Sequence, residues 1–336
     1  MKKTLIASAV AAAALSTSAF AMDPASELAS KLDSMPTVYG NIQLAWYHAD
    51  VDPGGSESAL IDNGSTIGFK HSHEISPGIT AFLKAELEFD ADDKAGNGGL
   101  SGFDEAYIGV KGDFGKVWVG SDDSTYERGV DIISNHWEFG DGAIDTASYD
   151  TGEGDLVQYT TPSMAGFEVG VAVQINGDGE KGDKSYPYQL SVTYSLDALT
   201  VAFALDSNDG DRAYSSATDG SAPNDENTYG LMASYDMGDF GLTGEYHTRS
   251  DVESTYGLMG TYSMGANTFA AGYVMIESDA PGSSEESSGV ALQALHNLSD
   301  HMYVWTEAYF VNSDPGVAGT ADSDGTVLAM GAAYVF

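Results

Sequence analysis

Apolar and polar side chains alternate along many short segments of this chain, and this period constrains the possible folds more than any other feature. In residues 79–89 every odd-numbered position is apolar: Ile79, Ala81, Leu83, Ala85, Leu87 and Phe89. Most of the even-numbered positions between them are polar, with Phe82 as the exception. A β-strand puts alternate residues on opposite faces, whereas a helix would scatter these residues around its axis. The pattern therefore predicts a strand with one apolar face.

The same alternation predicts sixteen strands along the chain. Their predicted ranges are 37–49, 63–73, 79–90, 103–111, 115–121, 155–161, 166–175, 187–195, 198–206, 227–236, 240–249, 253–263, 266–277, 287–297, 301–311 and 325–336. Segments of about 9–11 residues and an even strand number are typical of bacterial transmembrane barrels. Short turns alternate with long polar loops, including 50–62, 206–226 and 312–324. A soluble β-sandwich or β-solenoid is the alternative, and neither requires this asymmetry.

The last segment ends in the middle of its alternation. One face carries Leu328, Met330, Ala332, Tyr334 and the terminal Phe336. An unpaired terminal strand would fray into water, so its apolar face must be buried and its edge paired. Pairing with the first strand closes a barrel, and membrane lipid then covers the apolar face. We therefore predict an all-β, sixteen-stranded antiparallel transmembrane barrel over residues 37–336.

The N-terminus resembles an export signal. Lys2 and Lys3 precede an apolar run from Leu5 to Leu15, which is followed by small residues at 19 and 21. This order predicts a signal peptide over residues 1–21 that is cleaved after export, and the apolar run is too short for a membrane-spanning helix. Residues 22–36 include the only helix-like stretch that follows, and their structure is left open.

Acidic residues dominate the charge of the chain. It has 51 Asp and Glu against 13 Lys and Arg, giving a formal net charge of −38, and it has no cysteine. Nucleic acid is excluded as a partner because a phosphate backbone requires basic contacts. Disorder is disfavoured by the regular alternation of 19 Tyr and 13 Phe. Two explanations of the acidic composition remain: a surface adapted to high salt, or a lumen that attracts cations.

One connection, residues 121–154, is far longer than a hairpin loop requires. Its acidic residues are Asp122, Asp123, Glu127, Asp131, Glu138, Asp141, Asp145, Asp150 and Glu153, and Arg128 is its only base. It also has apolar residues that a solvated external loop would not need: Ile132, Ile133, Trp137, Phe139 and Ile144. We therefore predict that this loop folds into the lumen, with a disordered acidic loop as the alternative.

Three stretches resemble the general, non-specific trimeric porins of Gram-negative bacteria. They are STIGFKHSHEISPGITAFLKAELEF (65–89), FDEAYIGVKGDFGKVWVG (103–120) and YTTPSMAGFEVGV (159–171), and the terminal Phe336 and the signal peptide belong to the same pattern. The resemblance implies an outer-membrane barrel whose third extracellular loop folds inward and narrows the pore. It also implies a homotrimer with the first five predicted strands and residues 91–102 near the three-fold axis, in contact with outer-membrane lipid and lipopolysaccharide. The barrel-assembly machinery would read Phe336 and Tyr334.

In that family a Pro-Glu-Phe-Gly-Gly turn carries a carboxylate at the constriction, and residues 137–141 (WEFGD) resemble this turn without the proline. The resemblance therefore implies that Glu138 lies at the constriction with Asp141 and Asp131 beside it. Asp122 and Asp123, at the start of the loop, complete the acidic side.

The chain departs from the family where an arginine cluster would face these carboxylates. Thr66, Asp104 and Ser121 stand at three of the arginine positions, and Thr151 or Gly152 at a fourth. Lys70, Lys84 and Arg128 could partly compensate, although the sequence does not place them. The resemblance then implies a constriction that is acidic on more than one side and prefers cations.

The expected function is passive diffusion of small hydrophilic solutes and cations through a water-filled outer-membrane pore, with no enzyme activity and no cofactor. His71 and His73 share a strand face but are interpreted as wall residues, and no metal site is predicted. A substrate-selective, sugar-type channel is the alternative, with Tyr303, Trp305 and Tyr309 as its candidate aromatic track. A closed barrel with a structural or adhesive role is a third interpretation.

Overall fold

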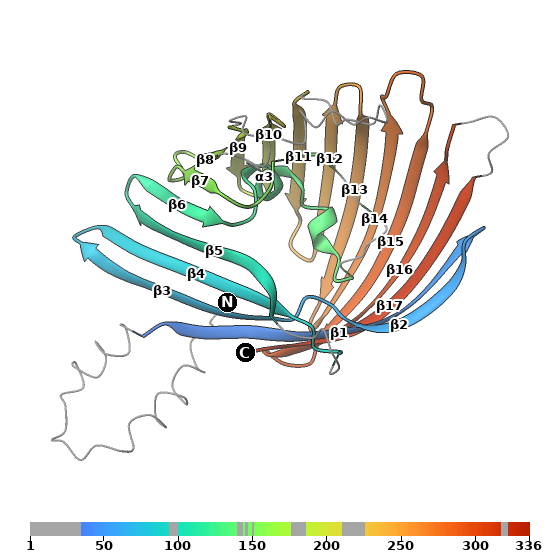
Figure 1. Cartoon of the computed structure of the whole chain (residues 1–336), viewed down its shortest axis with the longest axis horizontal. Coiled ribbons are helices and arrows are strands. Elements are labelled where there is room, and N and C mark those ends of the chain that lie inside the picture. Colours follow the sequence, from blue (N-terminus) through green and yellow to red (C-terminus); the bar gives the residue numbers. More distant parts are fainter. Residues whose placement is uncertain are drawn as a thin grey trace, which may run out of the picture.

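A computed structural model shows that most of the chain forms one curved, closed sheet (Figure 1). The structure describes residues 35–93, 100–139, 144, 147–149, 151–175, 186–209, 226–316 and 322–336. The first half of the sheet contains β1 (Thr37–Asp52), β2 (Gly55–Asp62), β3 (Thr66–Ser76), β4 (Ile79–Phe89), β5 (Leu100–Gly112), β6 (Gly115–Ser121), β7 (Leu156–Thr160), β8 (Phe167–Gln174) and β9 (Tyr188–Leu196). The second half contains β10 (Leu199–Asp206), β11 (Thr228–Asp236), β12 (Phe240–Arg249), β13 (Glu253–Met264), β14 (Asn267–Ser278), β15 (Glu286–Asn297), β16 (Met302–Asp314) and β17 (Ser323–Val335).

The sheet closes through antiparallel pairing of its first and last strands. β1 pairs with β17 from Asn41↔Val335 to Asp52↔Asp324, and each strand from β4 to β16 pairs with both of its neighbours in the sequence. β2 and β3 both pair with β1, so they are two parts of one strand interrupted at residues 63–65. Counted in this way, the described strands form the sixteen-stranded antiparallel barrel that the alternation predicts. No helix in the described ranges is long and apolar enough to cross a membrane.

The two faces of the sheet differ as the period of two requires. On β12 the side chain of Leu242 is exposed, whereas Thr243, Glu245 and His247 on the opposite face are buried. Exposed apolar residues continue on neighbouring strands at Leu231 and Leu258, on the face that lipid would cover. The polar side chains therefore point into the barrel.

The prediction of a loop at 50–62 is wrong. β1 and β2 form a hairpin paired from Leu44↔Asp62 to Val51↔Gly55, with Pro53 and Gly54 in its turn. This hairpin carries Asp, Ser and Glu residues that break the apolar alternation, so periodicity alone could not detect it. Its backbone hydrogen bonds hold the strands together without an apolar face. β16 and β17 likewise extend into the predicted loop 312–324, of which residues 317–321 lie outside the described part.

Two short helices interrupt the long connection between β6 and β7: α3 (Thr125–Val130) and η1 (Ser134–His136). The Oγ of Ser124 accepts a hydrogen bond from the backbone N–H of Glu127, which caps α3. Tyr126 and Val130, four residues apart, lie on the buried side of α3 against β10 and β11. The alternation did not predict these helices. Residues 1–34, with the expected signal peptide and helix-like segment, lie outside the described part.

Candidate functional site

The connection from 122 to 139 lies against the inner face of the barrel wall. In Figure 1, α3 and the segment after it run inside the ring of strands, and α3 packs on β8, β9, β10 and β11. Its contacts continue to β12 and β16, on the opposite side of the ring from β6. The segment therefore crosses the lumen.

A buried carboxylate on β16 holds the far end of this segment. Glu307 Oε1 accepts from the N–H of Glu138 at 2.8 Å, and Oε2 accepts from the N–H of Phe139 at 3.0 Å. The same carboxylate accepts from Gln293 Nε2 at 2.8 Å and from the hydroxyl of Tyr309 at 2.6 Å. Glu307 is 2% exposed, and these four donors satisfy its oxygens.

A second wall carboxylate holds the middle of the segment. Glu245 Oε1, on β12, accepts from the backbone N–H groups of Ile132 and Ile133 at 2.8 and 3.0 Å. Glu245 and Glu307 thus each bind two consecutive N–H groups of the same connection. Neither residue is predicted from the sequence. The signal that could have identified them is a glutamate on the strand face opposite the exposed apolar residues.

The beginning of the segment is held by a network on β6 and β7. Asp122 accepts from Trp118 Nε1 at 2.6 Å and pairs with Arg128 at 3.3 Å. Arg128 also donates to Gln158 Oε1 at 2.8 Å and to the backbone carbonyl of Asp123. The only base of the connection is therefore paired locally.

Three carboxylates remain in contact with solvent beside this network. The closest oxygens of Asp123, Glu127 and Glu153 lie within 4.8 Å of one another, and each side chain is half-buried or exposed. Burial, followed by the charges of Asp123, Glu153 and Asp131, raises the pKa of Glu127 from its ordinary 4.5 to about 7. We call Asp123, Glu127 and Glu153 the acidic rim.

A β-bulge places further acid on the adjacent wall. The pairing of β4 with β5 shifts between Ala85↔Ala106 and Leu87↔Phe103, which leaves both Asp104 and Glu105 on the inner side opposite Glu86. Lys84 pairs with Glu105 and lies 3.7 Å from Glu86. Asp104 is half-buried on this acidic stretch of wall.

Lysines also lie on the inner face of β3 to β6, and two of them are not among the residues predicted from the sequence. Lys111 and Lys116 are paired across β5 and β6 next to the short turn that joins these strands. Lys116 Nζ lies 3.9 Å from the ring centroid of Trp118, and Lys70 Nζ lies 5.0 Å from that of Tyr39. Lys111 and Lys116 lie at the turn end of β5 and β6, whereas the acidic bulge lies toward the loop end of β5. Lys84 lies between them and pairs with Glu105.

The predicted constriction residues do not form one cluster. Thr66, Asp122 and Asp131 are 5%, 6% and 4% exposed, so these three barely contact the lumen water. Thr66 instead exchanges hydrogen bonds with Asn41. Asp131 lies against β12, whereas Glu138 is held at β16, so Asp131 is not beside Glu138 as expected.

Glu138 and the residues around it bridge two parts of the wall. Its Oε2 accepts from the hydroxyl of Tyr303 at 2.9 Å, and its carbonyl accepts from Asn63 Nδ2 at 2.6 Å, in the break between β2 and β3. Burial raises the pKa of Glu138, while the Tyr303 hydrogen bond lowers it. Ser121 and Asp123 are half-buried near the start of the connection. Asp141 lies outside the described residues.

The aromatic residues considered for a sugar track are covered by the connection. Trp305 and Tyr309 are 4% and 0% exposed and pack in one cluster with Phe139 and Ile144. Only Tyr303 is half-buried, and it binds Glu138. The face shared by these three residues thus supports the connection and leaves little aromatic surface for a solute. His71 and His73 stack at a centroid distance of 5.4 Å on the wall.

A closed barrel with a connection packed inside it is the architecture of a pore with an internal loop, and sequence comparison agrees. A family model described as Gram-negative porin matches residues 6–316. The chain belongs to the Gram-negative porin family. It is therefore an outer-membrane porin, and the members of this family are passive channels rather than enzymes.

Two curated relatives indicate how far the similarity extends. A protein named "Monosaccharide porin" from Halomonas sp. is 28% identical over 379 aligned positions that cover both chains completely. A "Chitoporin" from Vibrio furnissii is 26% identical over 224 residues, covering 61% of this chain and 58% of that one.

Solved structures support the same barrel. An anion-selective porin from Comamonas acidovorans matches with a TM-score of 0.66 and 18% identity, covering 90% of this chain and 99% of that one. An OmpF of Salmonella typhi, in complex with daunomycin, matches with a TM-score of 0.70 and 18% identity, covering 90% and 97%. At this identity the likeness concerns the fold.

Proposed function

We propose that this porin is a cation-preferring diffusion pore for small hydrophilic solutes, in which the connection between β6 and β7 forms the constriction. The observation that carries the proposal is the acidic rim, which is solvent-accessible beside a wall stretch that adds Glu86, Asp104 and Glu105. The nearest bases, Arg128 and Lys84, are paired with Asp122 and Glu105.

Selectivity would arise from concentration of cations rather than from a binding step. Carboxylates in a narrow lumen with low-dielectric walls are screened less than surface charges, so they raise the local cation concentration. Water must fill the path because polar side chains line it, and the connection limits the size of the solute. Acid toward the loop end of β5, with Lys111 and Lys116 at its turn end, would make the two entrances of the pore electrostatically different.

Export and assembly complete the proposal. Residues 1–21 would be cleaved during export, and the barrel-assembly machinery would recognise Tyr334 and Phe336. The mature chain would form a homotrimer surrounded by outer-membrane lipid and lipopolysaccharide. The hydrogen bonds that join Phe336 to Gly40 support a role of the terminal residue in barrel closure.

The test is the reversal potential of single channels in a potassium chloride gradient. We expect the wild-type channel to be cation-selective, with the preference surviving moderate salt and shrinking at high salt. Neutralising the rim (D123N, E127Q and E153Q) and, separately, E138Q with D141N should move the reversal potential toward zero. D300N, on an exposed turn, is the matched control and should leave it unchanged.

An anion-selective wild-type channel would overturn the proposed preference. Unchanged selectivity in the rim triple variant and in the E138Q/D141N variant would show that these carboxylates do not line the constriction. A barrel that conducts no current would favour the structural interpretation.

A sugar-selective channel is the second candidate, and it rests on the name of the Halomonas relative, "Monosaccharide porin". The burial of Trp305 and Tyr309 argues against an aromatic track on β16. Titrating single channels with glucose separates the two candidates. A saturable, concentration-dependent block of the ion current would support the sugar channel, and a change that follows solution conductivity alone would support general diffusion.

A further inference from the structure

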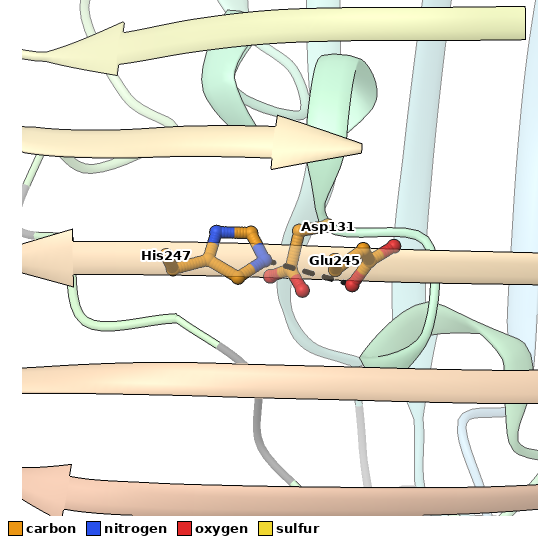
Figure 2. A group of neighbouring side chains, drawn as sticks. All are labelled: Asp131, Glu245 and His247. Carbon is orange, nitrogen blue, oxygen red and sulfur yellow. Dashed lines mark ion pairs between the residues drawn. The ribbon is translucent and has the colours of Figure 1, made fainter. Parts of the chain in front are cut away.

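Three side chains that can ligate a metal converge where α3 ends against β12. Glu245 and His247 are two residues apart on the inner face of β12, and Asp131 follows α3 (Figure 2). One ligand atom of each lies within 4.8 Å of the others. Asp131, Glu245 and His247 are 4%, 6% and 2% exposed, which distinguishes this group from the solvated acidic rim.

Two atoms in this group are buried and lack a hydrogen-bond partner within the described part of the chain. Glu245 uses Oε1 to bind the N–H groups of Ile132 and Ile133, which leaves its Oε2 without a donor. His247 Nε2 also lacks a partner, and it lies 3.5 Å from Glu245 Oε2. A buried polar atom without a partner costs free energy. A ligand bound between these two atoms would satisfy both of them.

The other imidazole nitrogen is already oriented. His247 Nδ1 lies 2.7 Å from the hydroxyl of Tyr126, in α3. Figure 2 shows the His247 nitrogen that faces Glu245, with Asp131 beside it. When Nδ1–H donates to Tyr126, Nε2 keeps a lone pair on that side. A histidine that ligates a metal has this arrangement, with its second nitrogen held by an oxygen acceptor.

We propose that Asp131, Glu245 and His247 bind a divalent transition-metal ion, with Zn²⁺ as the reference ion. One imidazole and two carboxylates suit Zn²⁺, whereas Ca²⁺ and Mg²⁺ prefer sites made of oxygen alone. Two carboxylates also balance the charge of a divalent cation in a buried place. Tetrahedral ligands about 2.1 Å from zinc lie roughly 3.4 Å apart, so ligand atoms that lie within 4.8 Å of one another must approach by at most about 1.4 Å.

Occupancy would tie the connection to the wall. Asp131 belongs to the connection and the other two ligands belong to β12, so the ion would join the two elements directly. It would add to the hydrogen bonds that Glu245 makes with the adjacent backbone. The bound ion would therefore stabilise the connection in the lumen.

The experiment measures zinc binding to the full chain, purified without a histidine tag and stripped with EDTA. Calorimetric titration with zinc chloride and elemental analysis should show one ion per chain. His247→Asn keeps an amide N–H where Nδ1 lies but removes Nε2, and it should weaken binding by more than the roughly 10–100-fold expected when a supporting group is lost. Tyr126→Phe, which removes such a supporting group, should weaken binding roughly 10–100-fold. His296→Asn removes an exposed imidazole on β15 and should change nothing.

The competing explanation is a protonated His247 in an ion pair with Glu245, and thermal unfolding separates the two. With a metal site, EDTA lowers the unfolding temperature of the wild type, zinc restores it, and the His247→Asn variant responds to neither. Absence of stoichiometric zinc in the wild type, or unaltered zinc affinity in His247→Asn, would overturn the proposal. If His247→Asn does not fold, Glu245→Gln and Asp131→Asn are measured in the same assays. Wild-type zinc affinity in both variants would overturn the metal-site proposal.

Discussion

At the scale of single residues, buried carboxylates on the wall organise the lumen. Glu245 and Glu307 each accept two consecutive backbone N–H groups from the connection. Hydrogen bonds to a charged acceptor are stronger than neutral ones, and each donor would be left unsatisfied if the carboxylate were removed. These two side chains therefore position the connection more firmly than its own short helices could.

Replacing Glu307 tests this role. Glu307→Ala leaves the N–H groups of Glu138 and Phe139 without an acceptor, and a hydrogen bond to a charged group contributes about 1.5–3 kcal/mol. We expect the variant to unfold at a lower temperature, to be cleaved by protease within 122–139, and to show a noisier open-channel current. Glu286→Ala, at the exposed end of β15, is the control. A variant as stable and as quiet as the wild type would contradict this role.

We expect Glu127 to give the pore a pH dependence near neutrality. Because burial and neighbouring acids raise its pKa to about 7, the folded chain disfavours the ionised form. The free energy of unfolding therefore decreases as the pH rises from about 4.5 to 7, and it increases again as the pH falls through this range. Glu127 therefore adds its negative charge to the rim as the pH rises through about 7.

Cation preference should consequently increase between pH 6 and 8. The reversal potential in a potassium chloride gradient, measured across this range, should show a step that Glu127→Gln removes. Glu285→Gln, on an exposed loop, should keep the step. A step of the same size in Glu127→Gln would assign the titration to another group.

At the scale of elements, the terminal strand closes the barrel with its final residue included. Gly40 and Phe336 exchange backbone hydrogen bonds of 3.1 and 2.9 Å, and β17 pairs along β1 and β16. Deleting Phe336 removes both bonds at the seam and an apolar side chain from the lipid-facing edge.

We expect deletion of Phe336 to lower the yield in the outer membrane and to increase degradation in the periplasm, because an open edge is slow to close and prone to mispairing. Quantitative immunoblots of membrane and periplasmic fractions measure both effects. Phe336→Tyr keeps the aromatic ring and should retain most of the yield. Normal yield of the deletion at high expression would count against the prediction.

At the scale of the whole molecule, an apolar hollow on the outside of β3 to β6 is the candidate contact between copies of the chain. It is lined by His71, His73, Ala81, Leu83, Ile108, Val110, Val117 and Val119, together with atoms of Phe82, Gly109 and Trp118. It lies on the strands that the family resemblance places near a three-fold axis.

Native mass spectrometry in mild detergent should therefore detect a trimer. Ile108→Lys, in the hollow, should reduce the trimer fraction, whereas Leu258→Lys carries the same charge on the apolar face of β13 and should not. A lysine on the lipid face costs about 2–4 kcal/mol near the bilayer midplane, so the two variants are compared at equal membrane yield. Monomers alone in the wild type would overturn the assembly.

The sequence alone determined the barrel and its strand order, because a half-buried strand records its two faces in every second residue. It did not reveal the hairpin of β1 with β2, whose polar ladder is held by backbone hydrogen bonds that leave no side-chain period. It identified residues 121–154 as an unusual connection, since apolar and acidic residues there had no place in a solvated loop. Only the tertiary structure placed Glu245, Glu307 and Asp131. Their partners lie more than a hundred residues away in the sequence, and closure of the barrel brings them together.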